Sequence, residues 1–221
     1  MRAWSSDAPS DAIARTVGAL PLLKRPYASA RFRLFGARVV ERVSRALPRQ
    51  GRLLDVGCGI GLLSSYLALR EPGRTLVGVE PDAAKVAVAR RAARALDLES
   101  DYLVGTLDAL APGASFDGIV ASDVLHHVPR HEQEPLLRRL IESLRPTGTL
   151  VIKEVTTRPL RKHALAYVTD LVMAGPREPF SFRHHTEWAS LLAALGLEAD
   201  VELAGQGLPY AHVLVTARRR A

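Results

Sequence analysis

Short apolar runs alternate with amphipathic segments through the middle of the chain. The run "RLLDV" is followed by the glycine-rich "GCGIG" and then by "LLSSYLALR", a helical pattern that stops near Pro72. The same succession recurs in "TLVGVE" and "DAAKVAVARRAARAL", where Asp82 can cap the helix. Strands that alternate with helices at this pitch predict right-handed βαβ units and a parallel sheet.

The second half of the chain continues this pattern and then departs from it. We expect further strands in "DYLVG", "FDGIV" and "GTLVIKEV", with a helix in "HEQEPLLRRLIESLRP". At the end, "LEADVEL" and "PYAHVLVTARR" are two strands with no helix between them. Neighbouring strands joined by a short turn pair antiparallel, so we expect one antiparallel hairpin to close the sheet.

An amphipathic pattern also precedes the first strand. Apolar positions recur at helical spacing at Phe32, Phe35, Val39, Val43 and Ala46. They predict one helix before Pro48, and we expect residues 1–48 to form a helical cap over a ligand-binding domain of residues 49–221.

Length, charge and cysteine content narrow the class of protein. A chain of 221 residues without repeats or linkers fits one α/β domain. The net charge of +7 comes almost entirely from scattered arginines, and aromatic residues make up only 5% of the chain, so we expect no nucleic-acid partner. The single cysteine, Cys58, excludes an internal disulfide, and no segment is apolar enough for a leader or a membrane span. We therefore predict a soluble, cytoplasmic protein.

The glycine-rich loop carries the chemistry. Asp55, Gly57, Gly59 and Gly61 stand at alternate positions behind the first predicted strand. A dinucleotide loop of the type G-x-G-x-x-G/A would need a small residue where Leu62 stands, and a carboxylate at a strand end repels a pyrophosphate. The second strand ends in Glu80, a position from which an acid binds both hydroxyls of a ribose. These residues predict an adenosine whose far end carries an ammonium group and no phosphate.

At these motifs the chain resembles the class I S-adenosylmethionine-dependent methyltransferases. "LLDVGCGIG" is similar to the first motif of the family, "LVGVEPD" to the second, "FDGIVASDVLHHV" to the fourth-strand motif and "LRPTGTLVIKE" to the passage into the fifth strand. The resemblance implies an α/β, Rossmann-like, seven-stranded sheet, mostly parallel with the last strand antiparallel, with helices on both faces. It also implies S-adenosyl-L-methionine as cofactor and a lid insertion at about 157–185.

The resemblance also implies which residues bind the cofactor. They are Asp55, Gly57, Cys58, Gly59, Glu80, Pro81, Thr106, Leu107, Ser122 and Asp123. Arg31 or Arg33 in the cap can meet the carboxylate of the methionine moiety. Similar sequences place an Asp after the third strand to contact adenine, whereas this chain has Thr106 there and Asp108 two residues later. Either Thr106 or a shifted loop that presents Asp108 would take that role.

The methyl acceptor is less clearly indicated. "SDVL" lacks the Asn/Asp-Pro-Pro-aromatic turn of enzymes that methylate base amines, so we expect a small molecule, methylated at oxygen, as in secondary metabolism. His126 and His127 lie near the carboxyl end of the sheet, where an imidazole can accept a hydroxyl proton. We expect His126 to face the pocket and His127 to be structural. The alternatives are an enzyme that methylates nitrogen or carbon of a small molecule, and a non-catalytic scaffold protein. We expect a monomer or a homodimer.

The predicted lid has two faces. Its apolar stripe comprises Leu160, Ala164, Val168, Leu171 and Val172. We expect this stripe to roof a pocket for a fairly hydrophobic acceptor, with His163 or Tyr167 touching the acceptor. His184 and His185 lack the spacing of a zinc site, so we expect no metal.

Overall fold

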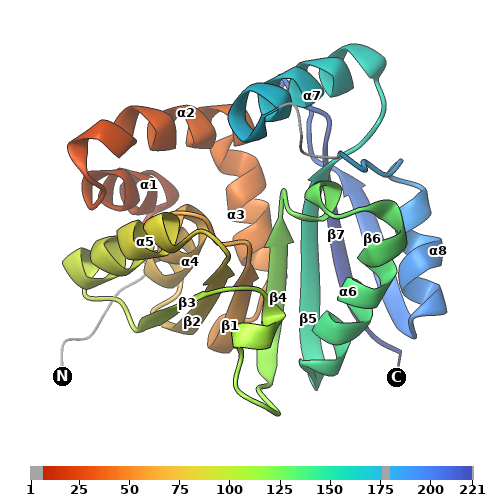
Figure 1. Ribbon diagram of the computed structural model, residues 1–221, viewed down its shortest axis with the longest axis horizontal. Coiled ribbons are helices and arrows are strands. Elements are labelled where there is room, and N and C mark those ends of the chain that lie inside the picture. Colours follow the sequence, from red (N-terminus) through yellow and green to blue (C-terminus); the bar gives the residue numbers. More distant parts are fainter. Residues whose placement is uncertain (1–6, 176–179, 221) are drawn as a thin grey trace.

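The computed structural model describes residues 7–175 and 180–220, and a seven-stranded sheet forms its centre (Figure 1). The strand order is β3-β2-β1-β4-β5-β7-β6, in which β7 runs antiparallel to both its neighbours and all other pairs are parallel. The strands are β1 (Gln50–Val56), β2 (Gly73–Glu80), β3 (Ser100–Val104), β4 (Phe116–Ser122), β5 (Leu144–Val155), β6 (Leu197–Leu203) and β7 (His212–Arg219). The predicted sheet and its closing hairpin are confirmed.

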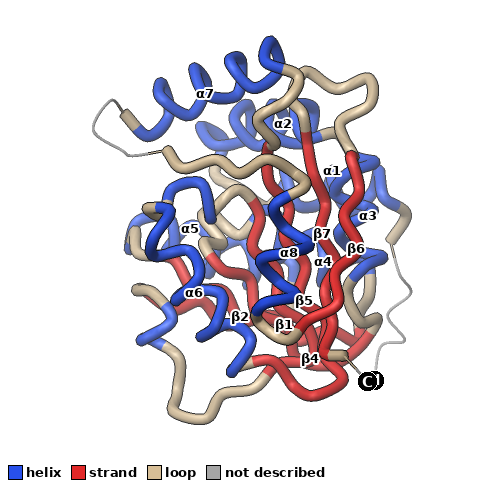
Figure 2. The backbone as a smooth tube through the Cα atoms, turned by 90° about the vertical axis from the view of Figure 1, so that its right-hand side faces the viewer, coloured by secondary structure: helices blue, strands red, loops and turns tan. Residues whose placement is uncertain are grey.

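Helices cover both faces of this sheet and one of its ends (Figures 1 and 2). The helices are α1 (Pro9–Gly18), α2 (Arg25–Phe35), α3 (Ala37–Ala46), α4 (Leu62–Arg70), α5 (Ala83–Leu96), α6 (Arg130–Glu142), α7 (Leu160–Ala174) and α8 (Glu187–Ala194). Short 3₁₀ turns are η1 (Leu22–Lys24), η2 (Leu107–Ala109) and η3 (Leu125–His127). Helices α3 to α5 lie on one face and α6 and α8 on the other (Figure 1). Above the strand ends, α2 lies on the side of β1 to β3 and α7 on the side of β4 and β5 (Figure 1).

Alternation along the strands builds a core on each side of the sheet. In β1, Leu53 packs into the cluster under α3 and α4, whereas Leu54 packs into the cluster under α6 and α8. The same division separates Val151 from Ile152 in β5. Because the inner strands are buried on both faces, their sequences are continuous apolar runs, which is typical of parallel strands.

Between residues 9 and 46 the chain is mostly helical, but the single predicted helix is wrong. The apolar period continues from Phe32 to Val43, yet Gly36 has φ +76° and separates α2 from α3. Val39 and Val43 of α3 are buried in the same cluster as Leu53 of the sheet. This positive φ suits glycine, and the break lets α3 pack against the sheet while α2 crosses its end.

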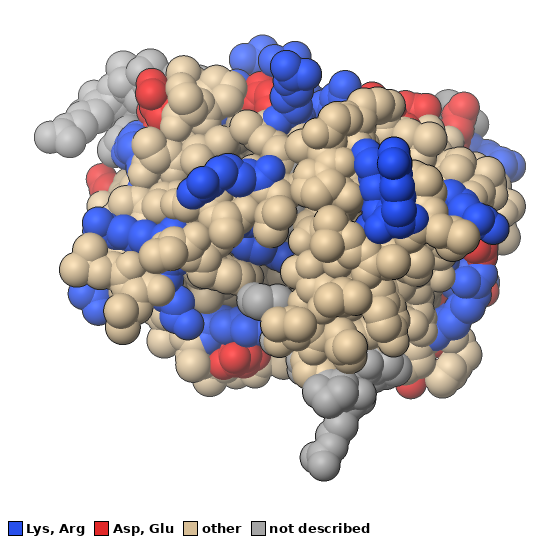
Figure 3. Space-filling model, turned by 90° about the horizontal axis from the view of Figure 1, so that it is seen from above, with Lys and Arg blue, Asp and Glu red and all other residues tan. Residues whose placement is uncertain are grey.

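The arginine-rich surface forms no single patch on the face that carries α2 and α7. Seen from above, Lys and Arg side chains lie in several groups separated by uncharged surface (Figure 3). Within residues 7–175 and 180–220, no helix has both the length and the apolar character needed to cross a membrane.

Candidate active site

The loop after β1 holds three glycines in the left-handed backbone region. The angle φ is +66° at Gly57, +55° at Gly59 and +77° at Gly61. A Cβ on Gly57 would lie 2.5 Å from Val124 Cγ2, and a Cβ on Gly61 would lie 2.9 Å from the Cβ of Ala89 on α5. At Gly59 no atom lies within 4 Å of that position. Gly57 and Gly61 therefore permit close packing, whereas Gly59 leaves bare backbone beside open space.

Asp55 at the end of β1 is buried, and its side chain accepts a hydrogen bond from Ser64 Oγ at 2.5 Å. Burial raises the pKa of Asp55 to about 7, against the lowering effect of the Ser64 hydrogen bond and with a small further rise from the charge of Glu80. A positive group beside Asp55 would favour its ionised form. The site thus presents a carboxyl group that titrates near neutrality.

Glu80, the last residue of β2, helps to shape the glycine loop. Its Oε2 accepts a hydrogen bond from Gly59 N at 3.1 Å and its Oε1 accepts one from Asp82 N at 3.2 Å. Lys85 Nζ lies 3.5 Å from Oε1. The carboxylate therefore links β2 to the loop after β1, and its contact with a ribose stays a prediction.

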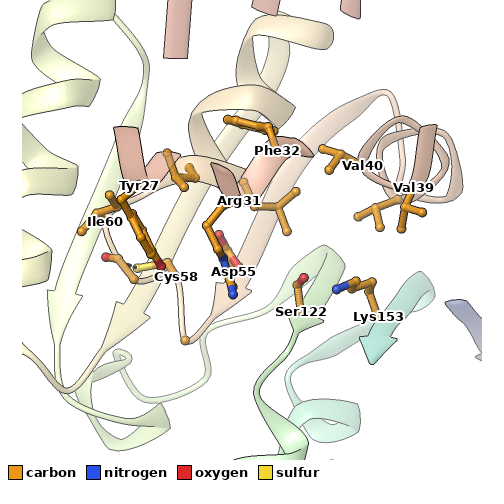
Figure 4. A pocket seen from close by; sticks show the side chains of 15 residues that line it. Tyr27, Arg31, Phe32, Val39, Val40, Asp55, Cys58, Ile60, Ser122 and Lys153 are labelled. Carbon is orange, nitrogen blue, oxygen red and sulfur yellow. Dashed lines mark hydrogen bonds between the residues drawn. The ribbon is translucent and has the colours of Figure 1, made fainter. Parts of the chain in front are cut away.

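A cavity that opens to solvent, here called the loop cavity, lies between the glycine loop, α2 and α3. Its polar lining includes Tyr27, Arg31, Asp55, Ser122 and Lys153, and its apolar lining includes Phe32, Val39, Val40, Val43, Ile60, Leu62 and Leu63. Figure 4 shows the side chain of Arg31 reaching from α2 into this space, with Ser122 and Lys153 together at the ends of β4 and β5. The loop cavity is therefore apolar under α3 and polar at the strand ends.

A second cavity of about 580 Å³, here called the α7 cavity, lies under α7. It is lined by Tyr27, Ala30, Arg31, Leu34, Asp123, Val155, Ala166, Thr169, Asp170 and Tyr210. Tyr210 Oη donates a hydrogen bond to Thr169 Oγ1 at 3.0 Å, which joins the strand end to α7. Because Tyr27 and Arg31 line both cavities, α2 forms their common wall.

A buried ion pair lies where the two cavities approach each other. Lys153 Nζ donates to both carboxylate oxygens of Asp123 at 2.7 Å, and Arg31 Nη2 lies 3.9 Å from Asp123 Oδ2. Burial favours the neutral form of Asp123, but the charges of Lys153 and Arg31 outweigh it and lower its pKa. Lys153 lines the loop cavity, whereas Asp123, predicted to bind the cofactor, lines the α7 cavity instead.

The three histidines predicted as catalytic do not line the described parts of either cavity. His126 was expected to face the pocket, but it is 3% exposed, because its Nδ1 lies 2.5 Å from Glu154 Oε2 and its ring stacks on Phe182 at 4.7 Å. His127 is half-buried, with its ring 4.2 Å from that of His126. His163 meets Phe182 edge-on at 4.7 Å. Aromatic rings therefore contact all three, and of these histidines His126 alone is fully buried.

The loop after β3 carries a hydrogen-bonded pair, Thr106 and Asp108. Thr106 Oγ1 donates a hydrogen bond to Asp108 Oδ2 at 3.0 Å, and Arg139 Nη2 donates to Asp108 Oδ1 at 2.6 Å. Asp108 is exposed, while Leu107 between them is buried in the core. A contact of Thr106 or of Asp108 with adenine stays a prediction. Pro81 is exposed after β2.

Helix α7 turns the opposite face inward from the one predicted. The exposed apolar side chains of α7 are Leu160, Leu165, Val168 and Val172. Tyr167, expected to touch the acceptor, is 42% exposed. Ala166 and Asp170 face the α7 cavity instead. The prediction placed the apolar stripe inward because burial of apolar residues is the rule, but here small and polar side chains pack against α2 and the strand ends.

The rings of His184 and His185 lie side by side at a tilt of 39°, with centroids 4.1 Å apart. Their Nδ1 atoms are within hydrogen-bond distance of Thr186 Oγ1 and Thr156 Oγ1, respectively. Among the residues that the structure describes, no group of three or more His, Cys, Asp or Glu side chains is placed to hold a metal ion.

The sequence analysis gave no role to several site residues, among them Ser64, Lys153 and Glu154. The last two had a signal, because "IKE" places adjacent charges in a strand otherwise predicted to be buried. Ser64 had none, since a serine on a helix is ordinary.

Known proteins are similar to this chain in sequence. A family model described as a methyltransferase domain matches residues 27–202. The chain is 32% identical over 203 residues to a protein of Methylocella silvestris named ubiquinone biosynthesis O-methyltransferase, covering 89% of this chain and 77% of that protein. A protein of the same name from Azorhizobium caulinodans is 34% identical over 160 residues, covering 70% of this chain and 61% of that protein.

A solved structure gives the same picture of the fold. It is the 1,6-didemethyltoxoflavin-N1-methyltransferase of Burkholderia thailandensis, with 1,6-didemethyltoxoflavin and S-adenosylhomocysteine bound. The TM-score is 0.67 at 19% identity, and the match covers 98% of this chain and 92% of that chain. At this identity the likeness concerns the fold alone.

Proposed function

The chain belongs to the class I S-adenosylmethionine-dependent methyltransferases, and from this we propose that it methylates an oxygen atom of a small, largely apolar molecule bound in the α7 cavity. The cofactor supplies a methyl group on a positively charged sulfur, and the protein must align that group with the acceptor. The observation that carries the proposal is the pair of cavities with one common wall, formed by Tyr27 and Arg31.

The loop cavity offers the groups that this cofactor needs. The bare backbone at Gly59 leaves room for close approach, and the buried carboxyl group of Asp55 suits an ammonium. We assign Glu80 to the ribose hydroxyls and Arg31 to the carboxylate of the methionine moiety. Arg31 reaches into the cavity, which supports its role (Figure 4).

The α7 cavity suits the acceptor. Its wall combines apolar side chains with a few polar groups, as the walls of small-molecule sites do. Val155, Leu34 and Ala166 supply apolar wall, and Tyr27 and Tyr210 supply aromatic rings with polar tips. A small phenol matches this mixture, because its ring is apolar and its hydroxyl needs one polar partner.

Two observations favour oxygen as the methylated atom. The relatives at 32–34% identity are named O-methyltransferases. A hydroxyl must also lose a proton as it is methylated, and the α7 cavity has the carboxyl groups of Asp123 and Asp170 in its wall. Those relatives are named for ubiquinone biosynthesis, so a secondary metabolite as acceptor stays a prediction without support from them.

Two alanines on α7 provide a matched test. Ala166→Phe fills the α7 cavity, whereas Ala164→Phe adds the same ring on the exposed side of the helix. The assay follows labelled methyl from S-adenosylmethionine to catechol, to 4-nitrocatechol and to the anilines that carry amino groups in place of their hydroxyl groups. Mass spectrometry locates the methyl group. Calorimetry with S-adenosylhomocysteine checks the cofactor site.

We expect Ala166→Phe to reduce catechol methylation at least about tenfold with cofactor affinity unchanged, since one lost acceptor pose costs more than about 1.4 kcal/mol. Ala164→Phe should behave as the wild type. Full activity of Ala166→Phe would show that the acceptor does not bind in the α7 cavity. If only the anilines are methylated, the methylated atom is nitrogen and the proposal of oxygen is wrong.

A further inference from the structure

A buried imidazole lies between two carboxyl groups beside the α7 cavity. His126 Nδ1 lies 2.5 Å from Glu154 Oε2, and His126 Nε2 lies 3.5 Å from Asp170 Oδ2. The His126 ring lies nearly parallel to that of Phe182, with 8° between their planes. Within the described chain, Nε2 makes no hydrogen bond. The edge of the ring that faces Asp170 is therefore the edge that can gain or lose a proton.

Glu154 is held rigidly in this arrangement. Its Oε1 accepts hydrogen bonds from Val124 N at 3.0 Å and Leu125 N at 2.7 Å, and the backbone oxygen of His126 accepts one from Ser181 N at 2.7 Å. A carboxylate fixed at Nδ1 keeps a proton on that nitrogen in both the neutral and the charged ring. Protonation changes of His126 consequently occur at Nε2, toward Asp170.

Asp170 connects this pair to the cavity. It comes from α7, lines the α7 cavity and retains 19% of its side-chain exposure. Burial raises the pKa of Asp170, and the nearby His126 opposes that rise. The other groups that face Asp170 or share its cavity wall are His127 from η3, Asp123 after β4, Arg31 and Tyr27 from α2, and Tyr210 before β7.

The other carboxyl group in this cavity is a weaker candidate for a proton acceptor. Both oxygens of Asp123 accept hydrogen bonds from Lys153, and that positive charge lowers the pKa of Asp123. A carboxylate with a lowered pKa is a poor base. Among the described residues no lysine or arginine hydrogen-bonds to Asp170, whose ion-pair partner is His126 Nε2 at 3.5 Å, and burial raises its pKa.

Resting on the proposed function, we propose that Asp170 is the general base that accepts the acceptor's hydroxyl proton, and that His126, fixed by Glu154, positions it. The acceptor O–H bond breaks and the proton moves to an Asp170 oxygen. The acceptor oxygen forms a bond to the methyl carbon with its electron pair. The electron pair of the broken carbon–sulfur bond remains on sulfur, which leaves S-adenosylhomocysteine as a neutral thioether.

His126 acts on Asp170 through its charge. Burial lowers the pKa of His126, but the charge and hydrogen bond of Glu154 outweigh it, so that the net shift is upward. A protonated imidazole beside Asp170 stabilises the carboxylate and lowers its pKa. Loss of His126 should therefore raise the pKa of Asp170 and move the acidic limb of activity to higher pH.

The first test compares Asp170→Asn with Asp200→Asn, which changes an exposed aspartate of the edge strand β6 that lines neither cavity. The acceptors are catechol and 4-nitrocatechol. We expect Asp170→Asn to lower kcat about a hundredfold or more, with KM and S-adenosylhomocysteine affinity nearly unchanged and the acidic limb of the kcat profile abolished. Asp200→Asn should match the wild type. Unchanged turnover in Asp170→Asn would overturn the proposal.

The second test addresses positioning. His126→Gln keeps a polar side chain but removes the charge, so we expect a smaller loss of kcat and an acidic limb moved to higher pH. Nitrogen NMR of the histidine rings provides a readout without any acceptor, because Asp170→Asn should lower the pKa of His126. If the acidic limb of the kcat profile does not move in His126→Gln, or if the pKa of His126 does not change in Asp170→Asn, then His126 does not position Asp170.

The two proposals fail in different ways. If the wild type methylates neither catechol at oxygen, the proposed oxygen chemistry fails and the role of Asp170 falls with it. If the wild type methylates the catechols and Asp170→Asn does so equally well, the proposed function stands and only the base is wrong.

Discussion

The buried carboxyl group of Asp55 makes cofactor affinity depend on pH. Burial at the end of β1 raises its pKa to about 7, so that the protein without cofactor holds a proton there at mildly acidic pH. If the ionised form binds the cofactor's ammonium, binding must release that proton. Affinity should therefore rise with pH through the range around 7.

The magnitude follows from the pKa. With a pKa of about 7, roughly three quarters of Asp55 is ionised at pH 7.5 and about a tenth at pH 6.0. The apparent Kd should consequently weaken about eightfold between these values, or about 1.2 kcal/mol. Asp55→Asn should bind weakly at both pH values, and the wild type should approach the variant as the pH falls.

The raised pKa of Asp55 has the opposite effect on folding stability, which should fall as the pH rises while cofactor affinity increases. A folded pKa of about 7 against 3.8 for the free side chain means that ionising Asp55 destabilises the fold, progressively as pH rises from about 4 to 7. The difference of about three pKa units corresponds to about 4 kcal/mol. Asp55→Asn should therefore raise the free energy of unfolding of the cofactor-free protein by up to about 4 kcal/mol at pH 8, and by little at pH 4.

Calorimetry measures the binding half of this prediction. S-Adenosylhomocysteine is titrated into the wild type and Asp55→Asn at pH 6.0 and 7.5, in two buffers of different ionisation enthalpy, which counts the protons released. The ligand ionises identically in both proteins, so their difference isolates Asp55. Ser64→Ala serves as a signed control: it removes a hydrogen bond that lowers the pKa of Asp55 and should move the pH dependence to higher pH. Equal affinity of the wild type at both pH values, or proton release that persists in Asp55→Asn, would refute the reasoning.

Two further predictions concern the scaffold and the loop. Glu41 accepts hydrogen bonds from Arg70 and Tyr66, and the Arg70 bond is the main cause that holds the pKa of Glu41 at about 2. The contribution of Glu41 to folding stability is therefore present above about pH 4.5 and is lost as the pH falls toward 2. Urea unfolding of Glu41→Gln should show a loss of up to about 3 kcal/mol at pH 7 that shrinks by pH 3, and a constant loss would contradict this account. Gly61→Ala should reduce stability because its methyl group meets α5, whereas Gly59→Ala should weaken S-adenosylhomocysteine binding more than it lowers Tm. The reverse order for the two glycines would show that Gly59 serves the fold and not the ligand.

Local patterns predicted most of the fold and the cofactor loop. The strand at Leu197–Leu203 was predicted with its exact bounds, and the turn after Asp55 was expected from its alternating glycines. Both signals act over a few residues: period two in the strand, and positive φ in the loop. The break at Gly36 was missed because the apolar period is the same on its two sides.

Amphipathicity alone gave the wrong orientation for α7. The rule that apolar side chains face inward placed Val168 toward the acceptor, but the structure exposes it and turns Ala166 and Asp170 to the cavity. A helix that crosses the end of a sheet packs against strand termini and polar loops. Its inner face is therefore selected by those neighbours, which the helix sequence does not contain.

The sequence by itself determined the order of strands and helices, the glycine loop and the carboxyl groups at the ends of β1 and β2, because each depends on residues close together in the chain. Tertiary structure decided the pairing of charges. Ser122 stands opposite Lys153 in the register of β4 and β5, and this brings Lys153 to Asp123 and Glu154 to His126 across about thirty residues. Burial at those strand ends then sets the pKa of each group, because desolvation and the distance to an opposite charge exist only once the chain has folded.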